Sequence, residues 1–277
     1  MAPPAHWRPG LVALDIDGTL CVEDDRTATT AHTRISPAVR AAVDAVVRSD
    51  THLVLCTGRS LLGVRPFLAE LGLARGTAIC SNGAVWLDAA TGDVRSKSVF
   101  DPVEPVTILR DLLPDAMFLL EELGVGNRTN VRHELGYHGQ HRVVDFPELV
   151  ATPTTRLSIG WPDHTAADLM AKLDGVVLPG VHCTYAEAAA GMAWMFASPA
   201  GVTKGSSLER LRIELGVPAT DTLAVGDGTN DLEMLAWAAH GVAMGQAPEV
   251  VRQVADEVTA PVTEDGLAHV LGRWFRP

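Results

Sequence analysis

Three residue types are scarce in this sequence. Of its 277 residues, three are Lys, four are Cys and 5% are aromatic. The cysteines (Cys21, Cys56, Cys80 and Cys183) lack the paired spacing of a zinc site, so we expect reduced thiols in a cytoplasmic protein. No apolar run reaches the ~18 residues that a membrane-spanning helix needs. The N-terminus also lacks the cationic start and apolar stretch of a signal peptide. We therefore expect neither a membrane partner nor secretion.

Positive charge is also in short supply. The sequence has 34 acidic residues against 22 Lys and Arg, which gives a formal net charge of −12. Nucleic-acid binding relies on neutralising phosphates, so we expect no nucleic-acid partner. Any anionic substrate would need a cation supplied locally, either by a bound metal ion or by well-placed Lys and Arg side chains. Nothing in the composition indicates an oligomeric state.

Short apolar runs alternate with amphipathic segments in both halves of the chain. The pattern predicts buried strands at residues 11–14, 52–56, 77–80 and 222–225, with helices between them. Ser36 followed by Pro37 is typical of a helix start, and Gly72 of a helix end. Alternating strands and helices with short connections predict an α/β fold with a Rossmann-like parallel sheet covered on both faces.

The middle of the chain breaks this alternation. It opens with a hairpin-like turn at residues 89–93, and two helices are predicted at residues 106–113 and 165–173. The strands between them suggest an antiparallel or mixed sheet. We therefore predict a core formed by residues 1–87 and 195–277, with a second α/β domain inserted at 88–194. Such insertions are tolerated where chain ends lie close together at a surface.

The first chemical motif follows the strand predicted at residues 11–14. Asp15 and Asp17 are two residues apart, and Gly18 permits a sharp turn after them. One carboxylate can act as nucleophile or metal ligand while the other moves a proton. An isolated Asp-Gly pair is also an ordinary turn signal, so this motif is informative only in combination with others.

Two further motifs could bind an anion. Thr57, Gly58 and Arg59 end the second predicted strand, where a hydroxyl and successive amides could hold phosphate. Lys204 stands before Gly205 at a predicted helix start. Taken alone, the first is also an ordinary helix cap and the second an ordinary surface lysine.

The fourth motif, Gly226-Asp227-Gly228-Thr229-Asn230-Asp231, follows the strand predicted at residues 222–225. Carboxylate oxygens suit Mg²⁺, which proteins hold through one or two carboxylates plus substrate phosphate. Asp231 is equally suited to a helix start, where the dipole favours an acid. All four motifs follow core strands or open core helices, and ligands of open α/β sheets bind at the carboxyl ends of the strands.

The order and spacing of these motifs resemble the haloacid dehalogenase superfamily of phosphohydrolases, and within it the Cof-like branch. The resemblance rests on DIDGTL, TGR, SNGA, TKG and GDGTNDLEM, at residues 15–20, 57–59, 81–84, 203–205 and 226–234. It implies a Rossmann-like core with an α/β cap inserted after the third core strand. The irregular segment of this chain begins there.

The resemblance also implies a role for each motif. Asp15 would attack phosphorus and become an aspartyl phosphate, while Asp17 would protonate the leaving alcohol and later deprotonate water. Mg²⁺ would be held by Asp15, the Asp17 carbonyl and Asp227, with support from Asp231. The phosphoryl oxygens would be held by Ile16, Thr57, Gly58, Lys204 and Asn230. Phosphoryl transfer depends mainly on positioning and charge stabilisation, so this division of labour is chemically reasonable.

Asp17 favours a phosphate ester over a haloacid, because an alkoxide leaving group needs a proton and a halide does not. The resemblance therefore implies a Mg²⁺-dependent phosphomonoester hydrolase acting on a small phosphorylated metabolite, with a sugar phosphate as the leading expectation. A phosphomutase and a catalytically silent sensor of a phosphorylated ligand are the alternatives. The inserted domain also carries six cationic or His residues that form either a face over the site or a solvated loop: Arg128, Arg132, His133, His138, His141 and Arg142.

Overall fold

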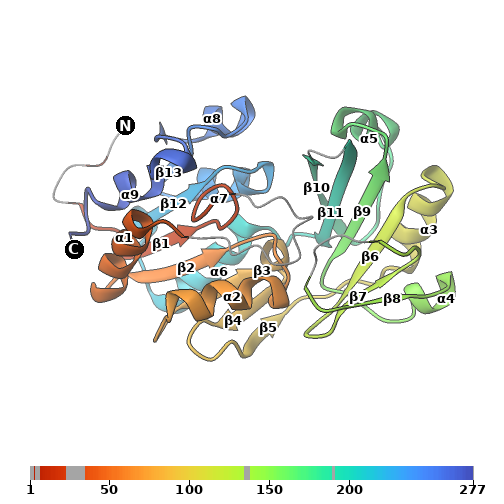
Figure 1. Cartoon of the computed structure of the whole chain (residues 1–277), viewed down its shortest axis with the longest axis horizontal. Coiled ribbons are helices and arrows are strands. Elements are labelled where there is room, and N and C mark those ends of the chain that lie inside the picture. The colour runs from red at the N-terminus through yellow and green to blue at the C-terminus, as the bar shows by residue number, and fades with distance from the viewer. Residues whose placement is uncertain (1–2, 4–6, 23–34, 134–137, 189–190, 277) are drawn as a thin grey trace.

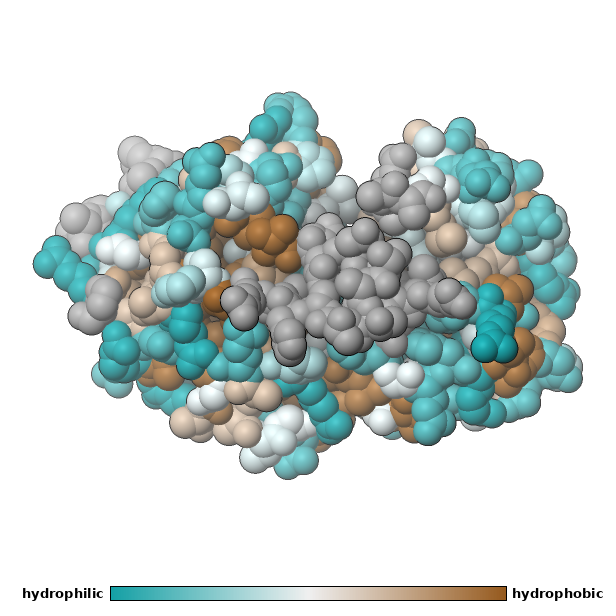
Figure 2. Space-filling model, viewed as in Figure 1, coloured by the Kyte–Doolittle hydropathy of each residue, from teal (hydrophilic) through white to brown (hydrophobic). Residues whose placement is uncertain are grey.

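The computed structural model describes residues 3, 7–22, 35–133, 138–188 and 191–276. The described chain forms two lobes, each built on one β-sheet (Figure 1). The charged segment at residues 23–25 lies outside the described residues. No helix in the described ranges is long and apolar enough to cross a membrane. On the face shown in Figure 2, hydrophilic residues cover most of both lobes.

The larger lobe contains an eight-stranded sheet. Its strands are β1 (Leu11–Leu14), β2 (His52–Cys56), β3 (Thr77–Cys80), β4 (Val85–Asp88), β5 (Val94–Lys97), β12 (Thr222–Gly226), β13 (His240–Ala243) and β14 (Glu257–Val258). Their order is β14-β13-β12-β1-β2-β3-β4-β5. All neighbours from β14 to β3 are parallel, and the β3–β4 and β4–β5 pairs are antiparallel. The predicted α/β fold with a parallel core sheet is confirmed.

Alternate side chains of the parallel strands point to opposite faces of the sheet, as strand geometry requires. Val12 and Leu14 pack with helices on one face, whereas Leu11 and Ala13 pack with helices on the other. The first face carries α1 (Pro37–Arg48), α2 (Leu61–Leu71) and α9 (Gly266–Leu271). The second carries α6 (Lys204–Leu215), α7 (Leu232–Trp237) and α8 (Glu249–Val254). The central strands are therefore buried on both sides.

Local sequence signals set the helix ends. The Ser36 hydroxyl accepts a hydrogen bond from the Val39 amide, and Pro37 occupies the first turn of α1. Gly72 ends α2 in the left-handed conformation, with φ of 56°, which glycine adopts at low cost. These caps match the boundaries predicted for both helices. They also place the β2–α2 connection, with its Thr57-Gly58-Arg59 motif, at the carboxyl edge of the sheet.

The smaller lobe contains a six-stranded sheet in the order β10-β11-β9-β6-β7-β8. Its strands are β6 (Met117–Glu122), β7 (Gly126–Thr129), β8 (Gln140–Val143), β9 (Leu157–Pro162), β10 (Val181–Ala188) and β11 (Met192–Pro199). Only the β7–β8 pair is parallel within this described sheet. The helices α3 (Val103–Leu112), α4 (Phe146–Leu149) and α5 (Ala166–Lys172) contribute to its separate apolar core.

Strand pairing differs from the predicted domain limits at both ends. The strand β5 falls inside residues 88–194 but pairs with β4 in the larger sheet. The strand β11 continues past residue 194 to Pro199 and pairs with β9 and β10 in the smaller sheet. In the sequence, the hairpin turn at residues 89–93 suggests the start of a new domain. In the structure, this hairpin extends the larger sheet. We therefore propose that the inserted unit begins after Lys97 and ends at Pro199.

Candidate active site

The four predicted motifs meet at the carboxyl edge of the larger sheet. Asp15 follows β1, Thr57 follows β2 and Asp227 follows β12, and the three strands are neighbours or separated by one strand. Lys204 opens α6 and reaches the same edge. Parallel strands bring their carboxyl ends to one side of a sheet, so motifs that are far apart in sequence become adjacent.

Lys204 lies between two carboxylates. Its Nζ donates to Asp15 Oδ1 and to Asp231 Oδ1, each at 2.6 Å. The Lys204 residue is 1% exposed and Asp231 is fully buried. The interpretation of Lys204 as a solvated surface lysine is thereby excluded. A buried ammonium with two charged partners is a strong ionic contact, and removing one member would leave an uncompensated charge.

The surroundings shift the pKa values of this pair. Burial opposes the charged form of Lys204, but Asp15 and Asp231 outweigh it and raise the pKa of the ammonium above its usual value. Burial and the charges of Asp231, Asp227 and Asp17 raise the pKa of the Asp15 carboxyl, while Lys204 opposes that rise. A further cation among these carboxylates would favour ionised Asp15, the form that can attack phosphorus.

Asp231 is fixed by hydrogen bonds to both of its oxygens. Oδ1 accepts from Lys204, while Oδ2 accepts from the amides of Asp227 and Gly228 at 3.0 and 2.9 Å. A Cβ atom on Gly226 would lie 2.6 Å from the Asp231 carboxylate, so glycine is required for this close approach. These contacts suit Asp231 to orienting its neighbours more than to binding a ligand directly.

Three carboxylates form a group with the donor set of a hard cation. Asp15, Asp227 and Asp231 each offer an oxygen, and these oxygens lie within 4.8 Å of one another. Gly18 has φ of 74°, and a Cβ there would lie 1.9 Å from Asp227 Oδ2. Gln246 Nε2 donates to that same oxygen at 3.1 Å. An all-oxygen group of this kind fits Mg²⁺.

Asp17 lies beside this group but its carboxylate is not one of the three. It forms an ion pair with Arg59, whose Nε donates to Asp17 Oδ2 at 2.8 Å and whose Nη2 donates to Oδ1. The Arg59 guanidinium also lies 4.7 Å from the centre of the Phe67 ring. The paired bonds fix the direction of the Asp17 carboxylate, because a planar guanidinium and a carboxylate match in geometry. Only the backbone carbonyl of Asp17 was expected to bind metal, so this placement is compatible with that expectation.

The loop after β2 packs against two amide side chains. A Cβ on Gly58 would lie 3.0 Å from Asn82 Oδ1 and 3.1 Å from Asn230 Nδ2, and these two atoms are hydrogen-bonded at 3.0 Å. Thr57 is fully buried, and its Oγ1 accepts from the Arg59 amide at 3.1 Å. The predicted phosphate ligands Thr57, Gly58 and Asn230 are thus brought together. The Ile16 side chain is fully buried in the core, so only its backbone can serve the site.

Two arginines of the cationic segment in the smaller lobe lie in different environments. Arg128 is 2% exposed and donates to the carbonyls of Glu148 and Thr152, at 3.0 and 3.2 Å, inside its own lobe. Arg142 is exposed and paired with Glu122 and Glu148. Neither a solvated loop nor a cationic face describes Arg128. Arg128 lies in a segment with few apolar residues, so the sequence does not indicate that this segment forms the buried strand β7.

Several residues of the site were not singled out in the sequence. Gln246 contacts Asp227 from the loop after β13, and Asn82 contacts Asn230 from the loop after β3. Asn82 is part of the SNGA motif, so its position after a core strand was an available signal. Glu121 and Arg156 reach the larger lobe from the smaller one, where they contact Ser81 and Gly58. No local pattern marks them.

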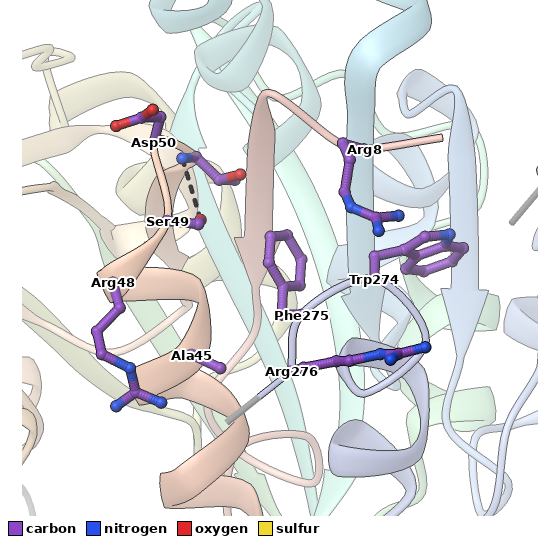
Figure 3. A pocket seen from close by; sticks show the side chains of 9 residues that line it. Arg8, Ala45, Arg48, Ser49, Asp50, Trp274, Phe275 and Arg276 are labelled. Atoms are coloured by element: carbon purple, nitrogen blue, oxygen red, sulfur yellow. Dashed lines mark hydrogen bonds between the residues drawn. The ribbon is translucent and has the colours of Figure 1, made fainter. Parts of the chain in front are cut away.

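A separate cavity of about 410 Å³ lies away from these motifs. It is lined by residues that include Arg8, Arg48, Thr51 and Arg276. Thr51 directly precedes β2, so the cavity borders the amino ends of the strands, opposite the edge where ligands of such sheets bind. Figure 3 shows Arg8 and Arg276 beside Trp274, while Arg48 points away from them. The arginines do not converge on one point.

Comparison with known proteins agrees with this geometry. The model for haloacid dehalogenase-like hydrolases matches residues 12–121 and 188–271. These segments make up more than half of the chain, which therefore belongs to that family. A phosphatase of the haloalkanoate superfamily from Bacteroides thetaiotaomicron is 25% identical and has a TM-score of 0.78, with 99% of this chain and 98% of that chain covered. A subclass IIB sugar phosphatase shares the fold, with a TM-score of 0.74 at 23% identity over 94% of this chain and 97% of that one.

Three relatives that align with nearly the whole chain are named as phosphatases. A putative phosphatase of Streptococcus pyogenes serotype M6 is 28% identical over 273 residues, covering 95% of this chain and 97% of the relative. An HMP-PP phosphatase of Serratia proteamaculans is 26% identical over 276 residues, covering 96% and 95%. A 5-amino-6-(5-phospho-D-ribitylamino)uracil phosphatase of Bacillus subtilis is 28% identical over 296 residues, covering 97% and 98%. The chain is a phosphatase of the haloacid dehalogenase family, as the motifs predicted.

Proposed function

We propose that the protein is a Mg²⁺-dependent phosphomonoester hydrolase that acts through an aspartyl phosphate on Asp15. The observation that carries the proposal is the buried arrangement of Asp15, Lys204 and Asp231, with Asp227 beside them. A nucleophilic carboxylate next to a fixed ammonium suits attack on a phosphate ester, since the ammonium offsets repulsion between two anions. The net charge of the chain is −12, so Lys204 supplies locally the positive charge that an anionic substrate needs.

The proposed reaction has two steps. An oxygen of Asp15 attacks phosphorus, and the ester P–O bond breaks as Asp17 gives a proton to the leaving oxygen. Asp17 then takes a proton from water, whose oxygen attacks the phosphorus of the aspartyl phosphate and releases inorganic phosphate and free Asp15. Arg59 holds Asp17 in one orientation through two hydrogen bonds, and one of these bonds must open when an Asp17 oxygen carries the proton of the first step.

Phosphoryl oxygens would be held by groups on four segments of the chain. Thr57 and the Gly58 amide come from the loop after β2, Asn230 from the segment before α7, and Lys204 from α6, together with the Ile16 amide. The Thr57 Oγ1 already accepts a hydrogen bond from the Arg59 amide. Its own proton is consequently available for a phosphoryl oxygen, because a hydroxyl both accepts and donates.

The donor chemistry fits Mg²⁺. We propose that Asp15, Asp227 and the Asp17 carbonyl bind the ion and that Asp231 supports them, since both Asp231 oxygens already accept hydrogen bonds. The bound ion would neutralise charge that develops on the phosphoryl group. Phosphatases of this family typically use Mg²⁺, and the grouped carboxylate oxygens in this chain support the same assignment.

For the substrate we propose a small phosphorylated metabolite, with a sugar phosphate as the first class to test. Two relatives that align over nearly the whole chain are named as phosphatases of small phosphorylated compounds, HMP-PP and 5-amino-6-(5-phospho-D-ribitylamino)uracil. We further propose a cytoplasmic setting, which the four unpaired cysteines support.

The test is phosphate release from a panel of phosphorylated sugars, nucleotides and cofactors. Wild type and Asp15→Asn would be compared in Mg²⁺ and in EDTA. Release by wild type in Mg²⁺ alone supports the proposal and ranks the substrates. An isomerised product without free phosphate would indicate a phosphomutase. Binding without turnover, unchanged in Asp15→Asn, would indicate a sensor and overturn the proposal.

A further inference from the structure

Two charged side chains of the smaller lobe are buried against the loops of the proposed site. Glu121 in β6 and Arg156 directly before β9 are each 4% exposed. They are cross-strand neighbours, because the Glu121 amide donates to the Arg156 carbonyl at 3.0 Å. Glu121 Oε2 accepts from Ser81 Oγ at 2.6 Å, and Arg156 Nη1 donates to the Gly58 carbonyl at 2.9 Å. One edge of the smaller sheet thus contacts the loops after both β2 and β3.

The contact of Arg156 falls on a peptide unit with two other roles. The Gly58 carbonyl and the Arg59 amide belong to the same planar group. That amide donates to Thr57 Oγ1, and the Arg59 side chain binds both carboxylate oxygens of Asp17. Arg156 is therefore connected through one peptide plane to a proposed phosphate ligand and to the proposed acid.

This connection has a physical consequence. A charged donor on a carbonyl polarises the peptide and strengthens the hydrogen bond that the opposite amide donates. It also limits rotation of the plane, and such rotation would move the Arg59 backbone and with it the guanidinium that orients Asp17. Loss of Arg156 would leave Asp15, Lys204 and Asp231 in place, because the hydrogen bonds that hold these three residues within the described chain do not involve Arg156.

We propose that Arg156 is a positioning residue that aligns Asp17 through the Gly58–Arg59 peptide when the smaller lobe rests on the larger one. This inference rests on the proposed function. Asp17 delivers its proton to the ester oxygen, which receives the electron pair of the breaking P–O bond. Arg156 therefore matters most for esters whose leaving group needs that proton, and least for esters whose leaving group departs as a stable anion.

The test compares an alkyl phosphate with 2,4-dinitrophenyl phosphate in wild type, Arg156→Met and Arg156→Lys. For Arg156→Met we expect kcat/KM on the alkyl ester to fall roughly 10- to 100-fold, the scale of a misplaced acid, and to fall less than about threefold on the dinitrophenyl ester. Arg156→Lys keeps the charge but not the planar fork, so it should show the same selectivity with a smaller loss.

Arg128→Met is the matched control. Arg128 is also a buried Arg of the smaller lobe that donates to backbone carbonyls, but both carbonyls lie in its own lobe. Any loss in Arg128→Met should be equal on the two esters. Thermal unfolding would verify folding, and if Arg156→Met does not fold, the selectivity of Arg156→Lys decides.

Equal losses on both esters in the Arg156 variants would overturn the inference. They would mean that Arg156 supports phosphate binding or protein stability and does not position Asp17. Failure of the underlying function would look different. In that case the wild type itself would release no phosphate from either ester in Mg²⁺, and the Asp15→Asn variant would be indistinguishable from it.

Discussion

Replacing Lys204 with Met removes the only positive charge that contacts both Asp15 and Asp231 among the described residues, while nearly preserving side-chain volume. Breaking a buried ion pair from one side typically costs about 3–5 kcal/mol, because the partner charge is left uncompensated. For a domain of this size we expect the midpoint of thermal unfolding in EDTA to fall by roughly 6–20 °C. Catalytic turnover should fall at least about 10²- to 10³-fold, since the ammonium is a fixed donor at the reacting centre.

Two conditions should reduce the stability deficit of Lys204→Met. Mg²⁺ should stabilise the variant more than the wild type, because the ion supplies a cation to the same carboxylates. Lowering the pH from about 8 to about 5 should also help. Without Lys204 to lower it, the raised pKa of the Asp15 carboxyl makes the native state bind protons that the unfolded chain does not, so stability rises as pH falls.

The matched control is Lys172→Met, an exposed lysine near the end of α5. It should change the free energy of unfolding by no more than about 0.5 kcal/mol. Chemical denaturation in EDTA and in Mg²⁺, at both pH values, gives the comparison. If Lys204→Met is no less stable than Lys172→Met in EDTA, the ionic contact deduced for the site is wrong.

Two further predictions concern backbone and surface. Gly18→Ala should abolish Mg²⁺-dependent activity, because Gly18 has φ of 74° and the added Cβ would lie 1.9 Å from an Asp227 oxygen. The control is Gly175→Ala, where φ is 71° and no atom lies within 4 Å of the added Cβ. This variant should keep its activity and lose only about 1–2 kcal/mol of stability to backbone strain. Arg273 lowers the pKa of the Glu257 carboxyl, so this pair stabilises the native state above the usual Glu pKa and is lost as pH falls through the lowered one. Glu257→Gln should therefore be less stable than wild type by urea denaturation at neutral pH, and this deficit should shrink as the pH falls below the usual Glu pKa; an unchanged deficit at low pH would refute the assignment.

Much of the site was accessible from sequence because it depends on short-range patterns. Asp15 and Asp227 each follow a run of buried apolar residues, and a parallel sheet brings the ends of such runs together. Lys204 was identified as a candidate by its scarcity and its place at a helix start. Its complete burial between two acids needed the packing of α6 against the sheet edge, which no local pattern encodes.

The contacts between lobes were not predictable for the same reason. Arg156 meets Gly58 across 98 positions of sequence, and Glu121 meets Ser81 across 40. These pairings depend on how the smaller sheet rests on the larger lobe. Arg128 was missed for a related reason: its polar segment forms the buried strand β7, which the sequence pattern did not predict.

The domain limits proposed from strand pairing differ from those predicted from sequence where local and long-range signals disagree. The turn at residues 89–93 is a sound hairpin prediction, and the structure contains that hairpin between β4 and β5. Sequence alone does not say which sheet a hairpin joins. Pairing of β4 with β3 assigns the hairpin to the larger sheet, and we propose that the inserted lobe starts after it.

The central claim, covalent phosphoryl transfer to Asp15, is tested most directly by trapping the intermediate. Asp17→Asn would be mixed with 2,4-dinitrophenyl phosphate and Mg²⁺, quenched in acid and digested for mass spectrometry. The leaving group needs no proton, but water activation lacks its base, so the phosphoenzyme should accumulate. We predict one phosphoryl group on the peptide that contains Asp15, and none in Asp15→Asn. A phosphoryl group on another residue, or turnover by the Asp15→Asn variant, would contradict the account.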